Sequence, residues 1–550
     1  MKNAALVSAV LALFGCAPDP LAPPPAPAGA GAALEAALQA AGPSGEVPIL
    51  VHLPAQSDAA SLPRGDRLSH TQLLEQRSLV VRTLKESFAA HGPLAQLLQD
   101  RGATGVEPLW IAGAVAARAT PTLVRELQRT LGRGRIELDR AVQFAPPRAA
   151  RGAPVPRWNL AAIHAPELWG RGLRGQGVVV ANMDTGVDLL HPALRARWRG
   201  GAKSWFDPFG NTRKPYDVIG HGTQAMGILA GGGPAGIAIG VAPHARWIAA
   251  KIFDDTGAST VSVIHRAFQW LLDPGGKGHA QDAPDVISVS WDLGAVNGCD
   301  LTFAPDLRAL RAAGIVVVFA AGNSGPQALS SESPANEGGL LSVGAIDARL
   351  AIAPFSSRGP SACTGAIYPD LVAPGVDVQT ADVSLRGAPS YAVVSGTSFA
   401  APHVAGVAAL LLGAFPHAAP AEVEAALRSS ATRLGPGDAD NVFGNGLVDA
   451  QAAWTALAAA VPIEIATRQL HPAAVGRAFH QMVRASGGVE PLRWSVSWGD
   501  LPLGLHLHAA TGLLAGHPRR AGDFAFAVQV VGAGGASAEV QLGLRVLRER

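Results

Sequence analysis

The sequence predicts an α/β protein in which a mostly parallel sheet lies between helices. A smaller α+β unit is expected before it and a small β-sandwich after it. Three observations lead to this prediction. Short β-branched runs alternate with helical runs over residues 158–460, strands and helices mix over 46–145, and strand-like alternation without helices fills 461–550. Continuous apolar strands alternating with helices are typical of a parallel sheet covered on both faces.

Length and composition indicate several globular domains. The chain has 550 residues, of which 48% are hydrophobic, and its formal net charge is +2. The length suggests roughly three or four domains. The nearly neutral charge gives no sign of a nucleic-acid partner, and we expect none. Three cysteines in so long a chain exclude a disulfide scaffold.

The N-terminus, residues 1–16, is predicted to be an export signal. Lys2 precedes the apolar run 4–14, which is too short to span a bilayer and fits the core of a secretory signal. The sequence LFGC resembles a bacterial lipobox, in which Cys16 would be lipidated. Ordinary signal cleavage near the same place is the alternative. Residues 17–45, rich in Pro and Ala, are predicted to form an extended spacer.

The first folded unit, residues 46–145, is predicted to have a ferredoxin-like fold. Its elements are a strand at 47–53, a helix at 73–101, two strands around a glycine turn at 106–119, a helix at 122–131 and a strand at 136–142. This order of strands and helices is that of the ferredoxin-like arrangement. A Pro/Arg-rich linker follows at 146–157, and such linkers are exposed and easily cut.

The central region carries the strands of the predicted parallel sheet. We expect strands at 177–184, 246–253, 285–291, 314–322 and 340–346, with helices at 260–272 and 305–313 among them. Functional groups in such folds gather at the carboxyl ends of the strands. The last region, 461–550, has strand-like runs separated by turns and is predicted to be a β-sandwich. Its stretch 501–530 resembles immunoglobulin-like modules of bacterial surface proteins.

Three short motifs bring together the groups of a serine nucleophile system. Asp184 ends an apolar strand in VVVANMDTGVD, His221 lies between glycines in GHGT, and Ser398 begins a long helix in SGTSFAAPHVAG. A serine hydroxyl needs a base, and the base needs a carboxylate that holds its tautomer. Alone, each residue has a structural reading as a cap or turn former. Their order, Asp then His then Ser, is one of the known orders of a catalytic triad.

These motifs resemble the subtilase family of serine peptidases. AAGNSG, FSSRGPS and PDLVAPG extend the resemblance over residues 158–455, and MDTGVDLLHPAL and HGTQAMG favour its bacillopeptidase F-like branch. The resemblance implies Asp184 as the orienting carboxylate, His221 as general base and acid, and Ser398 as nucleophile. It implies Asn323 as the side-chain donor of the oxyanion hole. Its substrate-binding walls correspond here to Ser290, Trp291, Asp292, Ala321 and Gly322.

The sequence leaves the roles of Asp292 and of two cysteines open and favours non-catalytic roles for three other polar residues. Asp292 stands where the family has a small residue, and it either favours basic or polar substrate side chains or caps the following turn. His403 is not the base of Ser398, because five residues along one helix turn the two side chains apart. Asp188 and His191 are expected to be structural. The pairing of Cys299 with Cys363 stays open, since sequence supplies no distance.

The resemblance implies an exported, self-processing serine endopeptidase that acts on proteins or peptides. Residues 46–145 would be its propeptide and intramolecular inhibitor, with a permanent accessory domain as the alternative. We expect a monomer that needs no cofactor and reaches the membrane only through a lipid anchor. Structural calcium is compatible with the family, but no metal ligands are assigned. The rival functions are a catalytically silent surface binding protein and a serine esterase, which would instead carry a G-x-S-x-G elbow.

Overall fold

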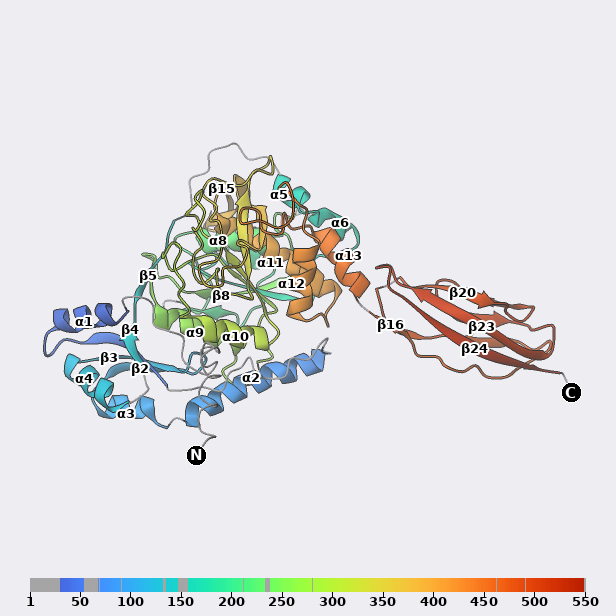
Figure 1. Cartoon of the computed structure of the whole chain (residues 1–550), viewed down its shortest axis with the longest axis horizontal. Helices are drawn as coiled ribbons and strands as arrows, with labels where there is room; N and C mark the ends of the chain where they lie inside the picture. The colour runs from blue at the N-terminus through green and yellow to red at the C-terminus, as the bar shows by residue number, and fades with distance from the viewer. Residues whose placement is uncertain are drawn as a thin grey trace, which may run out of the picture. The chain divides into compact units, whose positions relative to one another are not determined.

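The computed structural model describes residues 30–53, 68, 70–90, 92–131, 135–146, 157–210, 212–232, 238–278, 280–460, 462–489 and 491–548. Cys16, the first part of the spacer and nearly all of the processing linker lie outside these residues. The described chain forms two compact units. One contains the residues up to 424 together with 431–448, and the other contains 425–430 together with the residues from 449 onward. Figure 1 labels their elements.

The first unit is built around a seven-stranded sheet in which every neighbouring pair is parallel. This confirms the predicted parallel sheet. Its β10 and β11 are buried along their whole length, as expected for strands covered on both faces. In sheet order the strands are β13 (Leu371–Pro374), β12 (Leu341–Ile346), β11 (Val316–Ala320), β10 (Val286–Val289), β6 (Val179–Asp184), β8 (Arg246–Lys251) and β7 (Trp205–Phe206).

Helices cover both faces of this sheet (Figure 1). One pair is α9 (Val261–Leu272) with α10 (Ala304–Ala312), and the other is α8 (His221–Ala230) with α11 (Thr397–Ala414). Among the described residues, α11 is the one helix long and apolar enough to cross a membrane, but 83% of it is buried inside the protein. The first unit also contains three short helices and a hairpin. They are α5 (Trp158–Ala162), α6 (Ala165–Gly170), α7 (Pro192–Arg195) and the antiparallel strands β14 (Val378–Leu385) and β15 (Ala388–Val394).

Ahead of this sheet lies an antiparallel four-stranded sheet in the order β2-β3-β1-β4. Its elements are α1 (Ala30–Ala41), β1 (Val47–His52), α2 (His70–Ala90), α3 (Leu94–Asp100), β2 (Thr104–Leu109), β3 (Ala114–Ala119), α4 (Pro121–Thr130) and β4 (Arg135–Leu138). The prediction of a spacer over 17–45 is wrong for α1. Leu34 and Leu38, one helical turn apart, are buried in the apolar core of this sheet.

This N-terminal sheet packs directly on the larger one through α9 and α10. Val80 and Leu84 of α2 belong to the same apolar cluster as Phe268 of α9 and Leu310 of α10. Arg77 of α2 is buried, with 3% of its surface exposed. Its guanidinium donates to Ala313 O at 3.1 Å and pairs with Asp285 at 2.9 Å. The N-terminal unit is therefore joined to the larger sheet by an apolar core and a partly buried ion pair.

The second unit is rich in strands and includes α13 (Ala450–Ala460). Its main sheet has the order β17-β24-β23-β20, beside the sheets β18-β22-β21 and β16-β19. The strands are β16 (Ile463–Ile465), β17 (Ala473–Ala474), β18 (Phe479–Met482), β19 (Ala485–Gly487), β20 (Arg493–Gly499), β21 (Leu505–Leu507), β22 (Leu513–Gly516), β23 (Gly522–Val531) and β24 (Ser537–Leu547). The remaining helix, α12 (Pro420–Ser429), lies where the two units divide along the chain.

Candidate active site

Asp184 is the last residue of β6, at the carboxyl edge of the parallel sheet. The side chain is buried, with 2% of the residue exposed. Its Oδ1 accepts hydrogen bonds from the backbone N–H of Thr185 at 2.7 Å and from Nδ1 of His221 at 2.8 Å. Because a carboxylate only accepts, the imidazole proton lies on Nδ1. The basic nitrogen of His221 is therefore Nε2.

His221 is the first residue of α8, and the glycines around it allow this position. Gly220 has φ = +99°, a conformation that other residues rarely adopt. A Cβ on Gly222 would lie only 2.0 Å from Gly186 O, so a side chain there would push α8 away from the end of β6. The Nε2 atom of His221 is buried and has no hydrogen-bond partner among the described residues. It is thus poised to take a proton from a neighbouring group.

Ser398 is the second residue of α11 and lies next to the histidine. The ring of Phe399 is 5.2 Å from the imidazole of His221, centroid to centroid. Ser398 Oγ donates to Ser290 O at 3.3 Å, and Ser290 Oγ donates to Ser398 O at 2.9 Å. No hydrogen bond joins Ser398 Oγ to His221 Nε2 within the described part of the chain. The start of α11 is therefore bound to the end of β10, beside the base.

Asn323 follows β11 and is held against the start of α11. Its Oδ1 accepts from Thr397 N at 2.9 Å and from Thr397 Oγ1 at 3.1 Å. Thr397 Oγ1 also accepts from Gly322 N at 3.2 Å. The carbonyl of Ala321 accepts a hydrogen bond from the hydroxyl of Tyr368. Because the amide oxygen is engaged, the Nδ2 group of Asn323 is the part that can donate to a developing oxyanion.

The segment after β10 contains three of the predicted substrate-binding residues, Ser290, Trp291 and Asp292. The indole of Trp291 is buried, with 6% exposed, and packs in the core against Phe303 and Phe319. The indole therefore belongs to the core, and the role of Trp291 in substrate binding stays a prediction. Ser290 is also buried, with 5% exposed, and its Oγ donates to the backbone of Ser398. Asp292 is half-buried, and its Oδ1 accepts from Gly294 N at 2.7 Å.

Glu332 is a residue near the site that the sequence prediction missed. It is buried, with 3% exposed, and its Oε1 accepts from Ser357 Oγ at 3.1 Å. A Cβ on Gly322 would lie 2.6 Å from this oxygen. Burial, and then the negative charge of Asp292, raises the pKa of Glu332 to about 7. In the sequence, Glu332 lies in the polar run SSESP, which matches no motif. Its place near the candidate site is seen only from its contact with Gly322 in the fold.

Phe144 is a second residue that the prediction missed. The short strand β5 (Ala141–Gln143) pairs antiparallel with β9 (Ala258–Thr260), and Phe144 N donates to Gly257 O at 2.8 Å. The ring of Phe144 then lies edge-on against the imidazole of His221, with 4.9 Å between centroids. The chain leaving the N-terminal unit therefore covers the candidate base. The alternation of strand β5 could have suggested pairing, but nothing in the sequence names its partner.

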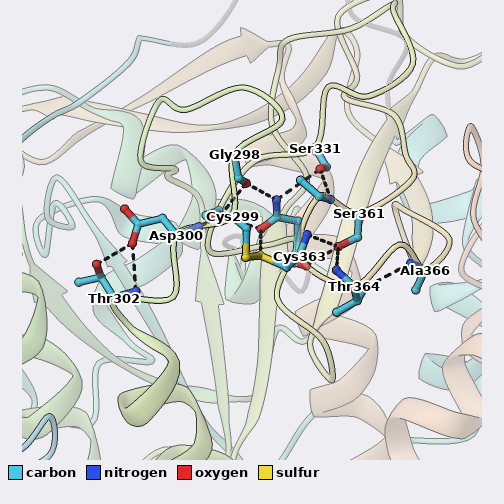
Figure 2. Close-up of a disulfide and its surroundings, with 12 residues drawn as sticks. Gly298, Cys299, Asp300, Thr302, Ser331, Ser361, Cys363, Thr364 and Ala366 are labelled. Carbon is cyan, nitrogen blue, oxygen red and sulfur yellow. Dashed lines mark hydrogen bonds between the residues drawn. A yellow bond between two sulfur atoms is a disulfide. The ribbon is translucent and has the colours of Figure 1, made fainter. Parts of the chain in front are cut away.

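The two described cysteines form a disulfide close to this region (Figure 2). The Cα atoms of Cys299 and Cys363 are 4.8 Å apart, which settles the pairing that the sequence left open. Hydrogen bonds surround the bridge. Asn336 Nδ2 donates to Gly298 O at 2.8 Å, and Ser361 Oγ donates to Asn336 O at 2.7 Å. The bridge fastens the loop that follows Asp292 to the loop before β13.

The other polar residues singled out from the sequence have structural contacts. His403 is fully buried, donates from Nδ1 to Phe399 O at 2.8 Å and accepts from Asn159 Nδ2 at 2.8 Å. Burial lowers the pKa of His403 to about 4, so the imidazole is neutral. Asp188 accepts from Leu190 N at 2.8 Å, and His191 caps α7. Within the described residues, no group of three or more His, Cys, Asp or Glu side chains could hold a metal ion.

Comparisons with known proteins agree with this geometry. The Subtilase family model matches residues 175–446, and an Ig-domain model matches 462–547. Bacillopeptidase F of Bacillus subtilis (strain 168) is 37% identical over 317 residues, which are 53% of this chain but 22% of that protein. Subtilisin Savinase of Lederbergia lenta is 36% identical over 54% of this chain and 97% of its own length. Alkaline protease of Alkalihalobacillus alcalophilus is 35% identical, covering 58% of this chain and 75% of its own.

The matched region contains the whole parallel sheet from β6 to β13, together with Asp184, His221, Asn323 and Ser398. The relatives that match along most of their length are proteases and subtilisins by name. The second match covers the strand-rich unit at the C-terminus. The chain belongs to the subtilase family of serine endopeptidases and carries an immunoglobulin-like domain at its C-terminus.

Proposed function

We propose that this chain is an exported endopeptidase that hydrolyses peptide bonds through the triad Asp184, His221 and Ser398, and that it is made as a self-processing precursor. The observation that carries the proposal is the 2.8 Å bond between Asp184 and His221 Nδ1, with the unpartnered Nε2 beside the start of α11. A carboxylate that fixes the tautomer in this way makes the opposite nitrogen a base.

In the proposed reaction, a rotation about the Cα–Cβ bond of Ser398 directs Oγ from Ser290 O to His221 Nε2. The hydroxyl proton moves to Nε2 as Oγ attacks the substrate carbonyl carbon. His221 then gives this proton to the departing amine, and an ester to Ser398 remains. Water loses a proton to His221 and attacks the ester, which releases the acid and restores the serine. Asp184 stays ionised and stabilises the imidazolium.

The carbonyl oxygen becomes negatively charged in both steps, and we assign its stabilisation to Asn323 and the backbone N–H of Ser398. The Asn323 amide is oriented by its two bonds with Thr397. The N–H of Ser398 lies in the first turn of α11, where backbone donors have no partner within the helix. Two fixed donors at this point stabilise an oxyanion at no cost of reorganisation.

We propose that the N-terminal unit is a propeptide that inhibits the cleft. The support is the pairing of β5 with β9 and the placement of Phe144 against His221. An extended peptide that adds to an exposed strand is a common way to bind protein substrates. Self-cleavage would then fall in the linker 146–157. Export with lipidation at Cys16 would present or release the mature enzyme at the cell surface, and we expect a monomer.

The test compares the full chain with Ser398→Ala. The parent protein should react with a fluorophosphonate probe, lose its N-terminal unit and cut peptides, while the variant should do none of these. If the parent is neither labelled nor processed, the proposed triad is wrong. The silent surface protein would then be the better description. Cleavage of carboxylic esters without cleavage of peptides would favour the esterase.

A further inference from the structure

Two carboxyl groups, those of Asp292 and Glu332, lie near segments that contact the candidate catalytic residues. Asp292 is two residues beyond Ser290, which is bonded to the backbone of Ser398. Glu332 lies against Gly322, where a Cβ would be 2.6 Å from Glu332 Oε1. Gly322 directly precedes Asn323, and consecutive Cα atoms are about 3.8 Å apart. The Glu332 carboxyl group is thus about one residue away from the proposed oxyanion donor.

Besides burial, the negative charge of Asp292 acts on the carboxyl group of Glu332 and helps to raise its pKa. Ser357 Oγ donates to Glu332 Oε1 at 3.1 Å, and the hydroxyls of Ser324 and Tyr368 also interact with Glu332. Among the described residues, no Lys, Arg or His forms an ion pair with either acid. Burying the carboxyl group of Glu332 near the half-buried acid Asp292 is costly, because the buried carboxyl group must stay protonated or find a positive charge. This cost indicates that the pair is retained for a ligand.

We propose that Asp292 and Glu332 bind the cationic side chain of the substrate residue that donates the acyl group, so that the enzyme cuts after Arg or Lys. The proposal rests on the proposed peptidase function. The carbonyl of that residue would point at Asn323, and its side chain would therefore leave the backbone next to Gly322 and Asp292. A guanidinium or ammonium there would satisfy both carboxylates with charge-assisted hydrogen bonds.

Two further observations favour a substrate side chain over a metal ion. The pair offers two carboxyl groups, whereas calcium takes about six to eight oxygen ligands, and no third His, Cys, Asp or Glu of the described residues joins the pair in a possible metal site. The linker 146–157, where self-cleavage would fall, contains Arg148, Arg151 and Arg157. A preference for arginine would direct the first cut to one of these three positions.

The experiment uses peptides that differ only in the residue before the scissile bond: arginine, lysine, leucine, and citrulline, which is the neutral counterpart of arginine. Active enzyme is counted by fluorophosphonate titration. We expect kcat/KM for the arginine peptide to exceed that for citrulline by about tenfold to a hundredfold, the range of charged hydrogen bonds. Asp292→Asn and Glu332→Gln should each lower this ratio toward one. Glu337→Gln is the matched control, because burial also raises the pKa of Glu337 to about 7 but it faces Arg308 and Arg311.

The ratio should also depend on pH. Because the pKa of Glu332 is raised, its charged form prevails only above about pH 7, so the arginine-to-citrulline ratio should rise between pH 6 and pH 8. Glu332→Gln should flatten this rise. Equal cleavage of arginine and citrulline peptides by an enzyme that the probe labels would refute the acid pair and leave the peptidase proposal standing. A preference that EDTA abolishes and calcium restores would also refute it. If Glu332→Gln does not fold, Asp292→Asn and the pH profile of the parent decide.

Discussion

Removal of the disulfide should destabilise the first unit measurably. The bridge joins Cys299 to Cys363, which are 64 positions apart. It closes a loop that contains β11, β12 and the segment with Glu332. The double substitution Cys299→Ser/Cys363→Ser opens this loop in the unfolded chain while replacing sulfur by the similar hydroxyl. The surrounding bonds, such as that from Asn336 to Gly298 O, can remain in the folded state.

The size of the effect follows from the loop length. In the chain-entropy description, closing a loop of 64 residues removes about 14 cal/mol/K from the unfolded ensemble, or about 4 kcal/mol at 25 °C. Unfolding carries about 2.1 cal/mol/K per residue, so roughly 400 residues that unfold together give about 0.8 kcal/mol/K. Dividing the loss of about 4 kcal/mol by an unfolding entropy of about 0.8 kcal/mol/K predicts that Tm falls by about 5 °C.

Calorimetry should be done in a Ser398→Ala background, which prevents self-digestion, at several scan rates. Reduction of the parent should lower its Tm by the same amount as the double substitution, whereas the double variant should not respond to the reductant. A fall below about 1 °C in both comparisons would contradict the loop-entropy argument. It would mean that the hydrogen bonds around the bridge already restrict this loop in the unfolded chain.

Three further predictions concern single side chains. Asn323→Ala should lower kcat about 10²–10³-fold with little change in KM, the loss that follows removal of one such donor in subtilisin, measured by steady-state kinetics. Phe144→Ala removes the ring from His221 and should shorten the lag before activity appears in the full chain, by about tenfold for this half-buried aromatic contact. His403→Gln tests whether protonation of His403 is linked to unfolding. Because the pKa of His403 is lowered to about 4 in the folded protein, the free energy of unfolding of the parent should fall by up to about 3 kcal/mol between pH 6.5 and pH 4. Denaturant unfolding should show that the variant lacks this loss.

The candidate triad could be proposed from the sequence because its three members lie in distinctive short motifs and follow one another in the order Asp, His, Ser. Gly220 and Gly222 flank His221 because the backbone there needs a positive φ and a close approach to Gly186. Such backbone requirements are visible in the sequence as glycines at fixed positions. The parallel sheet was predictable for a similar reason, since strands buried on both faces are apolar along their whole length.

The residues that the sequence analysis missed, Glu332 and Phe144, lie in no comparable sequence motif. Glu332 matters because it meets Gly322 and Asp292, which come from other segments of the chain. Phe144 matters because β5 pairs with β9, which lies more than one hundred residues further along the chain. Helix α1 was hidden by the Pro/Ala composition around it, although Leu34 and Leu38 carried the helical spacing. Tertiary pairing, rather than local propensity, decides each of these cases.

The segment Ser290-Trp291-Asp292 explains how one strand end can serve three purposes. Ser290 fixes the backbone of Ser398, and Trp291 anchors the segment in the core between Phe303 and Phe319. The residue directly after this anchor is Asp292, whose negative charge acts on Glu332. A smaller residue at position 291 would pack less tightly in the core, and the carboxyl group of Asp292 would then be held less firmly in place. The indole is thus expected to act on substrate selection from inside the core, through the placement of Asp292, without touching the substrate itself.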